Sequence, residues 1–140
     1  MVGIYFYPKN IKSPNGDCFV DIKLGEVEVY SKVSKTEKER KQGLSGTKEL
    51  KQDEGMLFIF PEEDKHSFWM KDMNYSIDVI WFDEENKVSF VEKDFSPESF
   101  PRVVTPLVSG KYVLEVPSGF FKSNNLKIGD KLEISTRECL

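Results

Sequence analysis

Short apolar runs recur along this 140-residue chain, and turn-forming residues separate each run from the next. Residues 19–24 and 26–30 alternate apolar with polar positions on either side of Gly25, which predicts a β-hairpin. The other runs that predict strands are 56–60, 67–71, 77–82, 87–92, 111–116 and 131–135. Closely spaced short strands predict an all-β fold, a single antiparallel β-sandwich or barrel-like domain over residues 1–140.

Two short helices are predicted to cap open edges of the sheet. The tetrapeptide SKTE at residues 34–37 has the spacing of a capping box, and the helix that follows is expected to stop at Gly43 in a left-handed conformation. Residues 118–124 predict a single helical turn with Ser118 as its N-cap. The proline-containing stretch 96–106 predicts a long loop, and such loops in compact domains often bind ligands.

Residues 67–82 are expected to form an aromatic hairpin centred on Asn74. In that register Met70 lies opposite Asp78, which places a carboxylate among large apolar side chains. Because apolar strands flank the hairpin, we expect most of its large apolar side chains to be buried. The side chains in question are those of Phe68, Met70, Val79 and Ile80.

Composition adds few constraints. Hydrophobic residues at 39%, with 11 Phe, favour a packed core, and the formal net charge of −4 without a basic stripe argues against nucleic acid as a partner. The N-terminal segment MVGIYFYPKN has neither a basic start nor a long apolar run, so it predicts no signal peptide and no membrane span. A cytoplasmic location follows by default, with export as the alternative if a segment is missing from the N-terminus. Cys18 and Cys139 could pair only if the first and last strands are neighbours, and unpaired thiols are favoured in a reducing cytosol.

Several short motifs occur in a recognisable order. They are ER followed by GL at residues 39–44, GMLFIF at 55–60, FWMK at 68–71, IDVI at 77–80, YVLEVPSG at 112–119 and IGD at 128–130. In these motifs the chain resembles the DUF192 family of small bacterial and archaeal β proteins, over about residues 26–134. The resemblance implies an antiparallel β-sandwich or barrel with two short helices. It implies no activity and no cofactor.

Charged residues within apolar strands are the best candidates for a site. Asp78 and Glu115 interrupt such strands, and a buried carboxylate needs a cation or hydrogen-bond donors. Lys71 is the cation nearest to Asp78 in the sequence, and Arg40 belongs to the family motif that ends in a Gly-Leu turn. Trp69 offers an aromatic ring on which a ligand can stack. Two interpretations remain open: these five side chains form a ligand pocket, or the charges form buried ion pairs that fix the ends of the sheet.

Catalytic alternatives have weaker support. Asp78 and Glu115 have the chemistry of a glycoside hydrolase acid–base pair, which would make the protein a small hydrolase of glycans or cell-envelope material. His66, the single histidine, follows a charged turn and has neither triad partners nor further metal ligands nearby. No metal site or cofactor is expected. The sequence therefore favours a non-enzymatic binding or accessory module whose partner is a small molecule or a protein.

Overall fold

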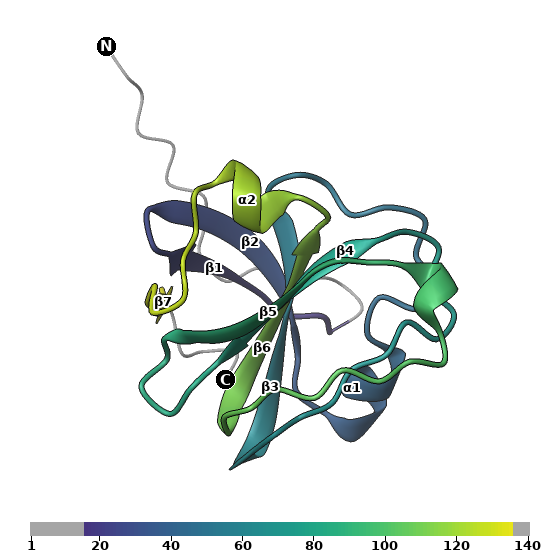
Figure 1. Cartoon of the computed structure of the whole chain (residues 1–140), viewed down its shortest axis with the longest axis horizontal. Helices are drawn as coiled ribbons and strands as arrows, with labels where there is room; N and C mark the ends of the chain where they lie inside the picture. Colours follow the sequence, from purple (N-terminus) through teal and green to yellow (C-terminus); the bar gives the residue numbers. More distant parts are fainter. Residues whose placement is uncertain (1–15, 136–140) are drawn as a thin grey trace.

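Seven strands form one sheet that curls around its own axis in the computed structural model, which describes residues 16–135 (Figure 1). The order of strands across the sheet is β5-β4-β6-β3-β2-β1-β7. In chain order the strands are β1 (Phe19–Leu24), β2 (Val27–Ser34), β3 (Glu54–Asp64), β4 (Ile77–Phe82), β5 (Val88–Phe95), β6 (Gly110–Pro117) and β7 (Leu132–Ile134). The predominance of strands agrees with the sequence-based prediction.

The sheet is mixed, so the prediction of a purely antiparallel sheet was wrong. Strands β2 and β3 run parallel, whereas the other pairs are antiparallel. A parallel pair requires a crossover connection, and here the crossover contains helix α1 (Glu37–Gln42). The charged sequence of this helix gave no sign that the strands on either side of it share one direction.

The two edges of the sheet approach each other at one end. The amide of Val88, at the start of β5, donates to the carbonyl of Asp130 at 2.8 Å, and the amide of Leu132 in β7 donates to the carbonyl of Asn86 at 2.8 Å. An isolated bridge between Lys87 and Lys131 lies between these bonds. The sheet is therefore a half-barrel in which both edge strands find partners at that end.

Two apolar clusters cover the two faces of the sheet. Within β4, Ile80 and Phe82 belong to one cluster, and Val79 and Trp81 belong to the other, as the period of a strand requires. Helix α2 (Phe120–Ser123) covers the first face, and α1 lies on the other side of the molecule (Figure 1). Connecting segments, rather than a second sheet, complete the second cluster, so the structure does not confirm a sandwich.

The predicted hairpin over residues 67–82 was wrong. Residues 67–71 form no strand and make a single bridge, between Phe68 and Val104. Strand β4 pairs instead with β5 and β6, and these two neighbours leave no free edge for a third partner. The expected burial was nevertheless confirmed for Met70, Val79 and Ile80, while Phe68 is partly buried.

Helix α1 begins later than predicted. Its capping box consists of Thr36 and Glu39, because Ser34 is still the last residue of β2. The helix ends at Gly43 as predicted, with φ at 50°, but a ψ of −134° lies outside the left-handed helical region. The predicted box at residues 34–37 was wrong, because the longer β2 moves the start of the helix two residues along the chain.

The second helix, α2, has Gly119 rather than Ser118 as its N-cap, which corrects the prediction. The hydroxyl of Ser118 donates instead to the carboxylate of Asp94. A short 3₁₀ turn, η1 (Pro97–Ser99), lies in the predicted loop over residues 96–106.

The expectation of unpaired thiols was wrong for Cys18, which is disulfide-bonded, and Cys139 lies outside the described residues. No helix within residues 16–135 has the length and apolar character needed to cross a membrane.

Candidate functional site

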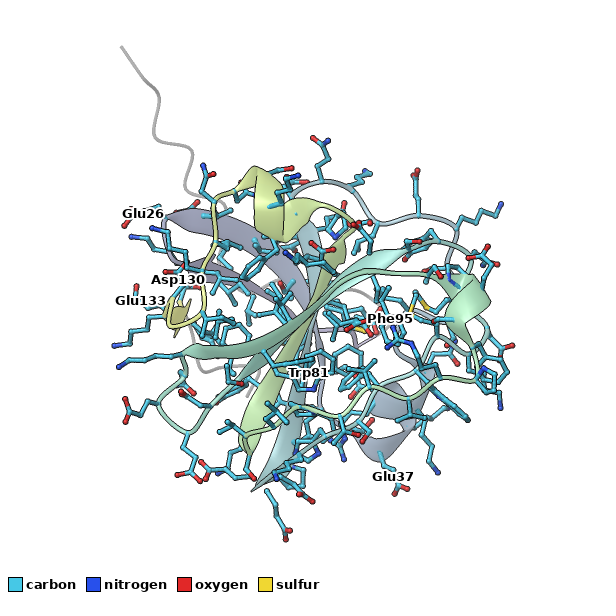
Figure 2. All side chains as sticks on the ribbon, viewed as in Figure 1. Glu26, Glu37, Trp81, Phe95, Asp130 and Glu133 are labelled. Carbon is cyan, nitrogen blue, oxygen red and sulfur yellow. The ribbon has the colours of Figure 1, made fainter. Side chains whose placement is uncertain are left out.

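A pocket of about 760 Å³ opens between α1 and the sheet. Its lining comes from α1, the turn at residues 43–46, strand β3, the segment at residues 67–73, and Glu115 of β6. Of the five candidate site residues, Arg40, Trp69, Lys71 and Glu115 line this pocket and Asp78 does not. Figure 2 shows Trp81 and Phe95 inside the molecule on the same side of the sheet, whereas Glu37 points outward from α1.

Hydrogen bonds hold two walls of the pocket together. The hydroxyl of Ser45 donates to the carbonyl of Lys71 at 2.9 Å, and the amide of Gly46 donates to the carbonyl of Asp72 at 2.9 Å. Just beyond, the hydroxyls of Thr47 and Tyr75 lie 2.7 Å apart. These bonds join the turn after α1 to the segment before β4 and hold the two walls of the pocket in place.

Arg40 fixes α1 to the sheet. Its guanidinium donates to the carbonyl of Ile59 at 3.1 Å and to the carbonyl of Lys35, and it lies over the ring of Phe60 with 5.3 Å to the centroid. Arg40 forms no ion pair among the described residues. The expected pairing of Arg40 with Glu115 or Asp78 was therefore wrong, because its Nη1 group donates to two backbone carbonyls instead.

Trp69 and Lys71 form the rim. Trp69 is 49% exposed, and its ring lies 5.2 Å from the ring of Phe100. The ammonium of Lys71 lies 5.7 Å from the Trp69 ring centroid, within cation–π range, and Lys71 makes no ion pair with any residue in the described range 16–135. The expected partner for Asp78 is therefore engaged with an aromatic ring instead.

Glu115 is the one buried carboxyl group among the residues that line the pocket. It is 6% exposed, and its Oε2 atom has no hydrogen-bond partner among residues 16–135. Burial raises the pKa of Glu115 to about 8, because water no longer solvates the charged form. The carboxyl group is therefore mostly protonated at neutral pH, and the prediction that it would have a donor or cation partner was wrong.

Asp78 has a structural role. Its carboxylate is 1% exposed and accepts hydrogen bonds from three backbone amides. The donors are Asp94 at 2.9 Å, Gly119 at 3.2 Å and Phe121 at 2.9 Å. Two of these amides lie at the start of α2, where unpaired N–H groups favour a negative charge. The prediction that Asp78 has hydrogen-bond donors is confirmed, although the donors are amides and not Lys71.

The two carboxyl groups project from opposite faces of the sheet. In the β4–β6 pairing, Asp78 lies opposite Val116 and Val79 lies opposite Glu115. Paired residues share a face and successive residues alternate, so Asp78 and Glu115 are separated by the sheet itself. This geometry contradicts their use as the acid–base pair of a hydrolase, which needs both carboxyls on one substrate.

His66 has local partners only. Its ring stacks on Phe60 at 3.5 Å between centroids and lies 3.0 Å from the carbonyl of Glu62. Its own backbone carbonyl accepts from the indole N–H of Trp81 at 2.7 Å. Within residues 16–135, no three His, Cys, Asp or Glu side chains form a group suited to a metal ion.

The sequence analysis missed the aromatic walls of the pocket. Phe58 and Phe60 line it from alternate positions of β3, and Phe68 contacts both rings, at 4.9 Å and 6.3 Å between centroids. The alternation of aromatic residues in GMLFIF was the available signal. The loop over residues 96–106, expected to bind a ligand, does not line the pocket but supports residues that do. Phe100 contacts the Trp69 ring, Val104 forms the bridge with Phe68, and the Thr105 hydroxyl lies 2.7 Å from that of Ser67.

Most of the chain matches one protein family. Residues 20–134 match the family model of DUF192, described as uncharacterized ACR. A UPF0127 protein from Thermococcus gammatolerans is 31% identical over an 88-residue alignment, which covers 59% of this chain and 53% of that protein. The chain thus spans about half the length of this curated relative.

Two solved structures share the fold. One is a protein of unknown function from Novosphingobium aromaticivorans, with a TM-score of 0.81, 23% identity and coverage of 89% of this chain and 91% of that one. The other, a putative transcription regulator from Sinorhizobium meliloti, has a TM-score of 0.76, 23% identity and coverage of 82% and 92%. At this identity the likeness concerns the fold alone.

Proposed function

We propose that this chain, which belongs to the DUF192 family, is a non-enzymatic binding module that holds a small organic ligand in the pocket between α1 and the sheet. The observation that carries the proposal is Glu115, a buried carboxyl group whose Oε2 atom lacks a hydrogen-bond partner in the part of the chain that the structure describes. An unsatisfied buried polar group costs free energy, and a ligand that supplies the partner recovers it.

Three other features support ligand binding at this place. The pocket volume of about 760 Å³ is typical of small-molecule sites. Aromatic side chains form its walls, and Lys71 at the rim is a cation without an acidic partner among the described residues. Binding therefore needs only groups that are already in position.

A thermal-shift screen against a panel of metabolites and oligosaccharides tests the proposal, because a ligand that prefers the folded state raises the melting temperature. We expect Trp69→Ala and Lys71→Met to reduce the shift that a hit produces. Both side chains are exposed, so these variants should keep nearly the same melting temperature without ligand.

Matched controls lie away from the pocket. Leu107→Ala removes another exposed apolar side chain and Lys111→Met another exposed lysine, and both should keep the full ligand-induced shift. If a hit raises the melting temperature of the Trp69→Ala and Lys71→Met variants as much as that of the wild type, the ligand binds elsewhere and the proposal is wrong.

A further inference from the structure

The inner end of the pocket combines one carboxyl group with two aromatic rings. Glu115 on β6 and Phe58 on β3 project from the same face, because Glu115 pairs with Met56 and Phe58 lies two positions further along β3. The ring of Phe68 meets the ring of Phe58 edge-on, with 4.9 Å between their centroids. Glu115, Phe58 and Phe68 all line the pocket, whereas Met56 does not.

The outer rings already have cations. Arg40 lies over Phe60 and Lys71 lies over Trp69, at 5.3 Å and 5.7 Å from the ring centroids. Among the described residues, no such cation contact involves Phe58. The inner rings and the carboxyl of Glu115 thus form a set of groups that attract a cation and that the protein's own cations do not fill.

We propose that the inner end of the pocket receives an organic ammonium group, with Glu115 as its counter-ion and Phe58 and Phe68 as flanking rings. This inference rests on the proposed function and specifies the chemistry of the ligand. An ammonium group donates up to three hydrogen bonds, and bonds between charged groups are stronger than those from a neutral hydroxyl. A ligand anion could only accept a hydrogen bond from the protonated form of Glu115, and the ionised form would repel it.

The test uses three probes of similar shape: phenethylammonium, 2-phenylethanol and 3-phenylpropionate. Two-dimensional ¹H–¹⁵N NMR titration of the wild-type chain locates and measures the binding of each probe. We expect phenethylammonium to shift the amides of residues 43–46 and 67–73 and to bind most tightly of the three. Glu115→Gln should weaken its binding roughly 10- to 100-fold and leave the alcohol unaffected.

The pH dependence of the wild type provides a second measurement that needs no variant at Glu115. Burial raises the pKa of this carboxyl to about 8, so ammonium binding below that pH must release its proton. The apparent affinity for phenethylammonium should therefore fall about tenfold per pH unit as the pH decreases from about 7.5 to 6, whereas the affinity for 2-phenylethanol should not change.

Other titratable groups around the pocket need to be considered. They are Glu37, Arg40 and Lys41 of α1, Lys71 and Asp72 of the segment before β4, and the nearby Tyr75. Side chains of these types ordinarily titrate outside the range from about pH 6 to 8, but histidine titrates within it. His66 stacks on Phe60 at the edge of the pocket, so His66→Gln serves as the control and should keep the pH dependence.

Each outcome decides the matter. If 3-phenylpropionate or 2-phenylethanol binds the same amides more tightly than phenethylammonium, the ammonium inference fails and the proposed function stands. A pH-independent affinity for phenethylammonium also overturns the inference. If none of the probes shifts the pocket amides, the inference is wrong, and the thermal-shift screen against metabolites and oligosaccharides decides the proposed function separately.

Discussion

Asp78 and Glu115 lie on adjacent strands, one register position apart, yet their carboxyl groups point to opposite faces of the sheet. Asp78 accepts three backbone hydrogen bonds beside α2, whereas the Oε2 atom of Glu115 accepts none. The same chemical group therefore has two surroundings: the carboxylate of Asp78 holds the start of α2, and the carboxyl of Glu115 has an oxygen without a partner among residues 16–135.

Replacing Asp78 by Asn should destabilise the fold without affecting the pocket. The amide nitrogen of Asn is a donor and would face backbone N–H groups that now have an acceptor. We expect a loss of about 2–4 kcal/mol in the free energy of unfolding, measured by urea denaturation. The exposed control Asp53→Asn should change it by less than about 0.5 kcal/mol. An unchanged midpoint for Asp78→Asn would contradict the structural role.

Glu115 should make the protein less stable as the pH rises. Burial raises the pKa of this carboxyl in the folded state to about 8, above its value in the unfolded chain, so the folded state holds a proton that the unfolded state has lost. The stability that this retained proton contributes is fully present below the pKa of Glu115 in the unfolded chain, and it is lost as the pH rises through about 8. The slope is about 1.4 kcal/mol per pH unit in that window.

Glu115→Gln isolates this effect, because the amide keeps the shape and does not titrate. The unfolding free energy of the wild type minus that of Glu115→Gln should decrease from about pH 5 to pH 8, because only the wild type loses stability in this range. Urea denaturation at each pH measures both values. The exposed control Glu133→Gln should show no such trend. A constant difference for Glu115→Gln would mean that the buried carboxyl is ionised throughout.

Arg40→Met should loosen α1. The guanidinium supplies the hydrogen bonds to Lys35 and Ile59 and the contact with the Phe60 ring, and methionine keeps only part of the apolar stem. We expect a loss of about 1–3 kcal/mol and faster hydrogen exchange in α1. Lys38→Met, on the same helix but exposed, should change neither quantity. Equal behaviour of the two variants would contradict the anchoring role of Arg40.

Ile80→Ala should cost about 2–5 kcal/mol, because the side chain is fully buried in β4 and its removal leaves a cavity. The same substitution at Ile128, which is 62% exposed, should cost much less. Thermal and urea denaturation of both variants measure the difference. A small effect at Ile80 would show that the centre of the sheet repacks.

The periodicity of the chain by itself determined most of the strands. Strands β1 and β4 have the predicted bounds, and the helix in the first crossover ends at Gly43 as expected. These features depend on neighbouring residues: a two-residue alternation, a cap and a glycine stop act over a few positions of the chain. Local sequence therefore carries enough information to predict them.

Only the tertiary structure decided which strands pair and what each charged residue contacts. Strand β6 lies between β3 and β4, so β4 cannot form the expected hairpin over residues 67–82. The register between β4 and β6 places Asp78 and Glu115 on opposite faces of the sheet. Both carboxyls looked alike in the sequence because each interrupts an apolar run. Their partners come from residues far along the chain, such as Phe121 for Asp78, and strand order alone brings such residues together.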